Sequence, residues 1–180
     1  MNTPVSELFR QSMIPAAILT ALVIVINLVL YLTDLIYGFG PLILFPFYLT
    51  GIILLMRNWK KNQMNNTVTF KEAFYFGLGM IMAYSAFIFI FDMIFYNFIA
   101  PDFYDGVVNY WTEFYQNIGV PEKQMEEMLE QFEKGRTSNA MMAVNALPSR
   151  LIFGTIIVLI VAAIIKKKNT PEESLPSNPA

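Results

Sequence analysis

The sequence has no cysteine and no histidine among its 180 residues. Without cysteine the chain has no disulfide, no thiol nucleophile and no thiolate metal site. Without histidine it lacks the commonest general base and the commonest metal ligand. We therefore expect neither a catalytic constellation nor a cofactor, and we interpret the chain as non-enzymatic.

Charged residues are also scarce. They make up 14% of the chain, against about 25% in a typical soluble domain. Hydrophobic residues account for 56% and aromatic residues for 15%, and aromatic side chains gather at bilayer interfaces. This composition predicts an integral membrane protein whose main partner is the lipid bilayer. Nucleic acid is not an expected partner, because no basic face interleaved with aromatic residues occurs outside the apolar runs.

Four apolar runs predict membrane-spanning helices, at residues 13–32, 41–56, 73–99 and 147–165. A helix of about 20 residues crosses a hydrocarbon core of about 30 Å. A secretory signal peptide is the rival interpretation of the first run, but its apolar region would hold only about 7–15 residues. Gly38, Gly40 and Pro41 predict the turn before the second run. The predicted fold is all-α, a bundle of four transmembrane helices.

The charges predict how the four helices cross the membrane. Basic residues gather between the second and third runs and after the fourth, at Arg57, Lys60, Lys61, Lys71 and residues 166–168. The connection between the third and fourth runs, about residues 101–146, is acidic. Positively charged connections stay in the cytoplasm. Both basic segments and both termini are therefore expected there, with the acidic connection outside.

The acidic connection contains two apolar stripes at helical spacing. One stripe comprises Met125, Met128, Leu129 and Phe132, within residues 121–135. The other runs through residues 104–118. Such a face needs a cover, which the bilayer interface, the other stripe or a partner would supply. We predict an amphipathic, helical, extracytoplasmic segment that faces a partner. Residues 1–168 are expected to form a single membrane domain, and residues 169–180 a disordered tail.

Polar residues inside the apolar runs form a candidate intramembrane cluster. Its members are Asn27, Tyr31, Asp34, Tyr84, Ser85, Asp92 and Arg150. An ionised aspartate in a bilayer is expensive and needs a partner. Asp92 and Arg150 reach similar depths, so we expect them to pair. Asp34 is the alternative partner of Arg150 if the third and fourth helices are not neighbours. The cluster is either a polar path or binding site, or a set of interhelical hydrogen bonds.

Three segments carry a family resemblance: TFKEAF at residues 69–74, YNFIAPDF at residues 96–103 and AIIKKK at residues 163–168. Their order and the spacing of the apolar runs resemble the bacterial membrane family called "domain of unknown function 4199". The resemblance covers nearly the whole chain. It implies a small, multi-pass protein of the bacterial inner membrane, and it implies no activity.

Two functions remain open from the sequence. The first is a non-enzymatic accessory or scaffolding protein that binds other membrane proteins, or a second copy of itself, through its helices and its outer segment. The second is an oligomeric small transporter or channel with a polar path near Asn27 and Asp92. Charged residues in the runs lie toward the outer end, which favours the accessory function.

Overall fold

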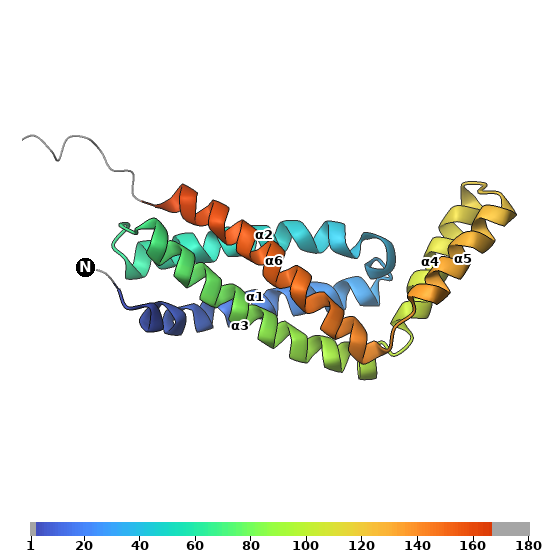
Figure 1. Cartoon of the computed structure of the whole chain (residues 1–180), viewed down its shortest axis with the longest axis horizontal. Coiled ribbons are helices and arrows are strands. Elements are labelled where there is room, and N and C mark those ends of the chain that lie inside the picture. Colours follow the sequence, from blue (N-terminus) through green and yellow to red (C-terminus); the bar gives the residue numbers. More distant parts are fainter. Residues whose placement is uncertain (1–2, 167–180) are drawn as a thin grey trace, which may run out of the picture.

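A computed structural model describes residues 3–166 of the chain, and all its regular elements in that range are helical. Four long helices lie side by side: α1 (Val5–Leu32), α2 (Ile36–Gln63), α3 (Phe70–Ile94) and α6 (Asn139–Ile165) (Figure 1). Beyond one end of them stands a hairpin of two shorter helices, α4 (Phe103–Asn117) and α5 (Glu122–Gly135). The predicted tail, residues 169–180, lies outside the described residues.

The four long helices are each long and apolar enough to cross a membrane. This confirms the all-helical prediction and its four membrane-length helices. The described part of the chain nevertheless has six α-helices, because the connection between α3 and α6 forms two of its own. Polar residues next to the apolar runs also continue the helices. For this reason α6 begins at Asn139, well before the apolar run at residue 147.

The predicted turn at Gly38, Gly40 and Pro41 is wrong, because these residues lie inside α2. The chain reverses earlier, at residues 33–35, where Asp34 adopts a φ of 57°. Aspartate is one of the few residues other than glycine that reaches this left-handed conformation, since its short side chain can bond locally. A proline removes only one backbone donor, and neighbouring helices in a membrane bundle compensate for such a loss.

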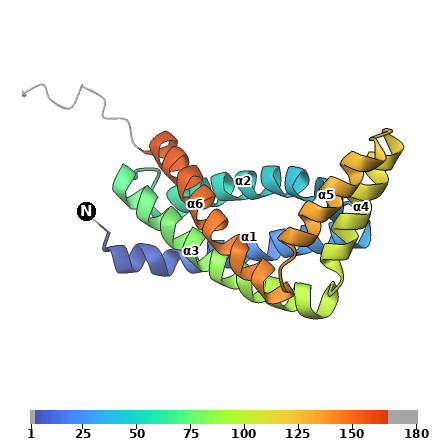
Figure 2. The ribbon, with the colours of Figure 1, turned by 45° about the vertical axis from the view of Figure 1, so that its right-hand side comes forward.

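Helix α3 is the central helix of the bundle. It packs against α1 on one side and α6 on the other, as the two views in Figures 1 and 2 show. A capping box begins it, in which Glu72 N donates to Thr69 Oγ1 at 3.2 Å and Thr69 N donates to Glu72 Oε2 at 3.0 Å. Deeper in the bundle, the Phe76 ring stacks on Trp59 with centroids 4.0 Å apart.

A π-helical segment, η1 (Phe95–Ile99), continues α3 without a break. Together they make a helical stretch of 30 residues. Its last turns pack against the end of α1, where the Phe95 and Tyr31 rings lie edge to face with their centroids 5.3 Å apart. Segments of π-helix occur often near functional sites, and this one begins directly after the turn that contains Asp92.

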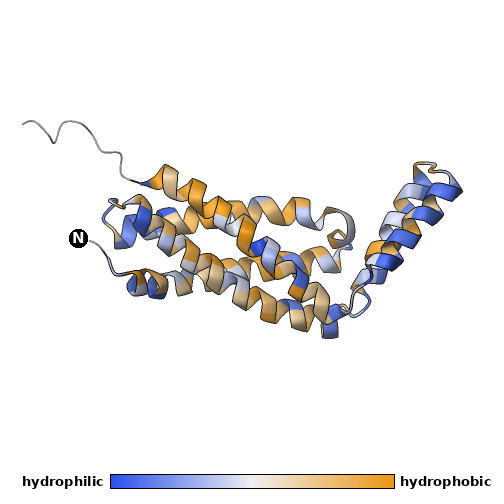
Figure 3. Cartoon of the chain, viewed as in Figure 1, coloured by the Kyte–Doolittle hydropathy of each residue, from blue (hydrophilic) through white to orange (hydrophobic). Residues whose placement is uncertain are grey.

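The outward surface of the four long helices is apolar. Figure 3 shows the bundle mostly in hydrophobic colours, with hydrophilic colours at its ends and on α4 and α5. Large aliphatic side chains point outward from it, such as Ile14, Leu42 and Ile164, each at least 70% exposed. Contiguous apolar surface of this kind needs a cover other than water. The bundle is therefore that of a membrane protein.

The hairpin is held to the bundle by two reciprocal contacts between tyrosine and glycine. Tyr110 of α4 lies over Gly38 of α2, where an added Cβ would come within 2.3 Å of the ring. Tyr37 of α2 lies over Gly106 of α4, where an added Cβ would come within 2.5 Å of the ring. Because neither glycine has a side chain, the two helices approach closely and each ring covers the other helix's backbone.

Replacing Gly38 tests this docking. We expect Gly38→Ala to displace the Tyr110 ring and to speed amide hydrogen exchange in α4, even though alanine favours helix over glycine by about 1 kcal/mol. Gly135→Ala is the matched control, since an added Cβ there lies 3.8 Å from the nearest side-chain atom. Unchanged exchange in α4 of Gly38→Ala would show that the hairpin does not depend on this contact.

Candidate functional site

Asp92 of α3 and Arg150 of α6 form an ion pair inside the bundle, in which Arg150 Nη1 donates to Asp92 Oδ2. The two residues are 58 positions apart in the sequence. The Asp92 side chain is 2% exposed and that of Arg150 is 24% exposed. The expected pairing of these two residues is therefore confirmed. Asp34, the alternative partner, lies exposed in the turn between α1 and α2.

Local sequence explains how the pair comes together. Asp92 lies on the buried face of α3, one turn from Ile88. On α6, Gly154 follows Arg150 by one turn, and an added Cβ there would lie 2.6 Å from Cγ2 of Ile81. The glycine thus lets α6 approach α3 at the level of Ile81, one turn along α6 from Arg150. Arg150 lies about 16 Å along α6 from Asn139, and Asp92 lies in the last turn of α3, which η1 continues.

A cavity of about 350 Å³ adjoins the pair, and all four long helices line it. Its polar lining comprises Asn27, Tyr48, Tyr84, Ser149 and Arg150. Its apolar lining comprises Val23, Leu44, Phe45, Ile88 and Phe153. The rings of Tyr48 and Tyr84 lie next to each other, with centroids 5.1 Å apart. One charged group and several hydrogen-bonding groups thus converge on a mostly apolar space, which is the usual composition of a ligand pocket.

Polar atoms around this cavity lack hydrogen-bond partners. Within residues 3–166, Asn27 Oδ1, Tyr48 OH and Ser85 Oγ are buried and unbonded. Leaving a buried polar atom unbonded costs about 1–3 kcal/mol. Ser149 differs, since its hydroxyl donates to the Ala146 carbonyl at 2.9 Å. Asn27 and Tyr48 line the cavity, but these two oxygen atoms are enclosed by the packing of the helices, and Tyr48 OH lies against Gly154 of α6.

The structure brings together part of the predicted polar cluster. Asn27, Tyr84 and Arg150 line the cavity, and Asp92 is bound to Arg150. Ser85 is buried next to Tyr84 but does not line the cavity.

Two members of the predicted cluster lie elsewhere. Tyr31 OH donates to the Ile99 carbonyl at 3.2 Å, at the end of η1. Asp34 is in the turn that follows α1. The sequence interpretation missed Tyr48 and Ser149. The only signal for Tyr48 is a hydroxyl-bearing ring in a short apolar run, and Ser149 is adjacent to Arg150.

A second cavity, of about 520 Å³, lies between α1 and α2 at the opposite end of the bundle. Gln11 and Trp59 are in its lining, and Trp59 Nε1 donates to Gln11 Oε1 at 2.8 Å. Along α1 and α2, Leu19 and Gly51 lie between the residues that line the two cavities, and an added Cβ on Gly51 would lie 2.6 Å from Leu19 Cδ1. A continuous polar path through the bundle would require this contact to open.

The apolar stripe of α5 packs against α4 of the same chain. Met125 is 8% exposed, and Met128, Leu129 and Phe132 are half-buried. Tyr104 OH of α4 donates to the Phe132 carbonyl. Of the three covers that the sequence left open, the other stripe is the one that contacts these residues. The exposed apolar side chains of the hairpin are instead Phe114, 43% exposed, and Ile118, 59% exposed.

These features define a helical membrane protein with a buried ion pair beside a cavity and a helical hairpin at one end. The chain belongs to the family described as "Protein of unknown function (DUF4199)", which matches residues 16–167. The match confirms the resemblance inferred from the three sequence segments, and it covers every residue of the predicted polar cluster. No curated protein matches the chain, and no solved structure matches it.

Breaking the ion pair should destabilise the protein. Removing one partner of a buried pair leaves an uncompensated charge, at a cost of about 3–5 kcal/mol. We expect Asp92→Ala and Arg150→Ala each to lower the thermal midpoint in detergent. The loss of unfolding free energy should lie toward the lower end of that range, because Arg150 is 24% exposed. The double variant should lose less stability than the sum of the losses of the two single variants.

Arg136→Ala is the control for this cycle. Arg136 pairs with Asp105 at 2.7 Å on the surface of the hairpin, with both side chains about half exposed, and such pairs contribute about 0–1 kcal/mol. Additive losses for Asp92→Ala and Arg150→Ala would contradict an energetic coupling between them.

Proposed function

We propose that this chain is a small, non-enzymatic accessory protein of the bacterial inner membrane, which binds other integral membrane proteins through its outer hairpin and its bundle. The observation that carries the proposal is the docked hairpin. Two helices stand beyond the bundle, are fixed to α2 by Tyr37 and Tyr110, and expose apolar side chains. A rigid projection of this kind can present a surface to a neighbour at low cost in conformational entropy.

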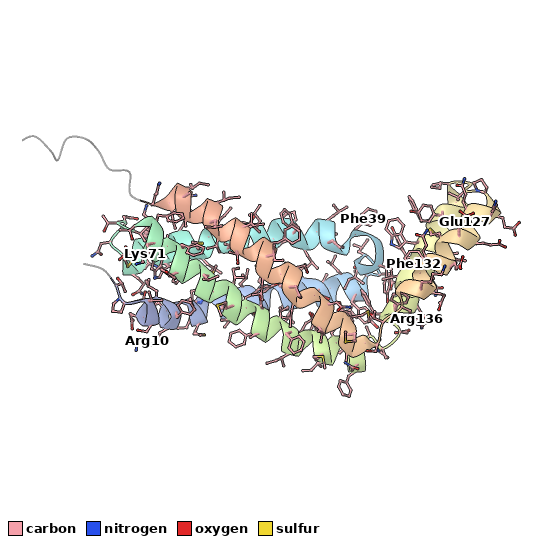
Figure 4. The ribbon with its side chains drawn as sticks, viewed as in Figure 1. Arg10, Phe39, Lys71, Glu127, Phe132 and Arg136 are labelled. Carbon is pink, nitrogen blue, oxygen red and sulfur yellow. The ribbon has the colours of Figure 1, made fainter. Side chains whose placement is uncertain are left out.

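The proposal places all four long helices across the bilayer as one domain, with both termini in the cytoplasm. The charges of the two ends of the bundle support this orientation. Arg10 and Lys71 lie at the end where the chain begins, and Glu127 lies on the hairpin at the other end (Figure 4). Because cationic connections are retained in the cytoplasm, the hairpin would lie outside.

The proposed contact surface is the exposed edge of α4. Phe114 and Ile118 are exposed, and the Phe114 ring packs edge-on against Trp111 with centroids 5.6 Å apart. Aromatic residues are favoured both at bilayer interfaces and at the centres of protein interfaces.

The second candidate, an oligomeric transporter or channel, draws support from the two cavities in the bundle. It would need the contact between Leu19 and Gly51 to open so that the cavities join. Its charged group, Arg150, is engaged by Asp92. The accessory function needs no such rearrangement, and for this reason we propose it first.

Reporter fusions test the orientation. A phosphatase inserted at Gln124 should be active, because the hairpin would be extracytoplasmic, whereas one fused after Ile165 should be inactive. A fluorescent reporter that matures only in the cytoplasm should give the reverse pattern at the same two positions. Activity of the phosphatase after Ile165 would contradict the placement of the C-terminal end.

Site-specific crosslinking tests the proposed contact surface. A photoreactive phenylalanine analogue at position 114 should give discrete adducts with other membrane proteins, or with a second copy of the chain, in native membranes. The same analogue at Glu127, exposed on the other helix of the hairpin, is the control and should give fewer. Adducts to phospholipid alone at position 114 would place that edge in the bilayer and argue against the accessory function.

A further inference from the structure

Arg150 has hydrogen-bonding groups that the ion pair leaves unused. Within residues 3–166, Nη1 is the only nitrogen atom of its guanidinium with a hydrogen bond, to Asp92 Oδ2. The buried atoms without a partner in that range are Asn27 Oδ1, Tyr48 OH and Ser85 Oγ, and Nε and Nη2 of Arg150 are not among them. The Arg150 side chain is also 24% exposed. Unlike those three oxygen atoms, its unused donors are therefore accessible from outside the protein.

The unused donors lie on one edge of the guanidinium. The N–H of Nε and one N–H of Nη2 point in the same direction, and this planar fork matches two oxygen atoms of a phosphate or a carboxylate. Asp92 binds Nη1 and is 2% exposed, so it leaves that edge to another acceptor. An arginine at membrane depth is costly unless its donors are bonded. The open edge therefore favours a ligand that carries two acceptor oxygen atoms side by side.

The cavity that Arg150 lines is otherwise mostly apolar, and all four long helices contribute apolar side chains to it. Phe45 of α2 and Phe153 of α6 are 53% and 62% exposed, whereas Val23 and Ile88 are at most 6% exposed. The opening therefore lies between α2 and α6. If these helices cross a bilayer, the opening faces acyl chains, and the ligand that fits it combines an oxygen-rich group with an apolar chain.

The position of Arg150 along α6 matches the level of lipid phosphates. The apolar run of this helix begins at residue 147, so Arg150 lies about 4.5 Å inside it. The head-group region of a bilayer extends about 5–8 Å beyond the hydrocarbon core on each side. Arginine side chains near the end of a membrane helix commonly extend to this region. A phosphate of the adjoining leaflet is therefore the acceptor within reach of the open edge.

We propose that this cavity binds a phospholipid of the adjoining leaflet. The phosphodiester accepts hydrogen bonds from Nε and Nη2 of Arg150, and one acyl chain enters the cavity between Phe45 and Phe153. Asp92 compensates the charge of Arg150, so the site does not require a lipid with a net negative charge. The volume of about 350 Å³ lies in the usual range for ligand pockets, about 300–1,000 Å³. The proposal rests on the proposed placement of the four helices across the bilayer, which the reporter fusions test separately.

Native mass spectrometry of the full chain in detergent measures this binding. Phosphatidylcholine, phosphatidylglycerol and diacylglycerol, all with the same acyl chains, are titrated in turn. We expect the first molecule of either phospholipid to bind with similar affinity, because both carry the phosphodiester. Diacylglycerol has the same chains without the phosphate and should bind at least several-fold more weakly.

Arg150→Lys tests the contact with the phosphate. Lysine keeps a cation for Asp92 but lacks the planar fork, so phospholipid affinity should fall several-fold, toward that of diacylglycerol. Arg136→Lys is the matched control, since it makes the same change in the exposed ion pair with Asp105 and should leave lipid binding unchanged. Thermal midpoints show that both variants are folded.

Leu44→Phe tests the place of the acyl chain and does not touch the ion pair. It enlarges a side chain in the wall of the cavity, so it should weaken the binding of all three lipids several-fold. Leu54→Phe makes the same change on the same helix at a residue that is 59% exposed and is not part of the cavity wall. This control should bind all three lipids as the unmodified chain does.

Four results would overturn the proposal. Equal affinity for diacylglycerol and the phospholipids would show that the phosphate is not bound. A strong preference for phosphatidylglycerol over phosphatidylcholine would show that net charge governs binding. Unchanged phospholipid affinity in folded Arg150→Lys would exclude the fork as the contact. Unchanged affinity in Leu44→Phe would place the lipid elsewhere on the bundle.

Discussion

A carboxylate buried inside a membrane-length bundle must meet a cation, and the rest of this structure is arranged around that requirement. Asp92 is 2% exposed and binds Arg150, so α3 and α6 have to be neighbours at that depth. Gly154 makes the approach possible by leaving room for Ile81 and Tyr48. Arg150 also lines a cavity of about 350 Å³, together with Asn27 and Tyr48. The ion pair and the cavity are therefore parts of one site.

The two regions of the molecule differ in where their polar and apolar side chains lie. In the bundle, apolar side chains face outward and the polar residues face inward, which is the arrangement expected when lipid is the solvent. In the hairpin, the apolar stripe of α5 packs against α4, the acids of α5 are exposed, and Phe114 and Ile118 of α4 remain exposed. The reciprocal contacts of Tyr37 and Tyr110 with glycines join the regions, so that a neighbour bound at the hairpin would also be held at a defined position relative to the bundle.

Much of this architecture could be predicted from the sequence, because hydropathy and charge placement are strong signals in membrane proteins. The four long helices and the pair of Asp92 with Arg150 were predictable, the latter from depth alone. The turn between α1 and α2 was not predictable. Gly38, Gly40 and Pro41 are residue types that often end a helix, yet they lie inside α2, whereas the residue type of Asp34 does not by itself indicate a turn. Nor was the role of Tyr48 predictable, because its place in the cavity depends on how α2 packs against Gly154. The cover of the α5 stripe required knowledge of a tertiary contact, and a single sequence gives no distances between helices.

The site depends on a bond between Asp92 and Arg150 that persists when the helices lie in a bilayer. The most direct measurement is solid-state NMR dipolar recoupling in bilayers, between carboxyl ¹³C of aspartate and guanidinium ¹⁵N of arginine. The background should carry Asp105→Asn, because Arg136 and Asp105 form another pair of the same type. We expect a strong coupling in Asp105→Asn protein, and we expect it to vanish when Asp92→Asn is added. If Asp105→Asn protein shows no such coupling, Asp92 and Arg150 are not bonded in the bilayer.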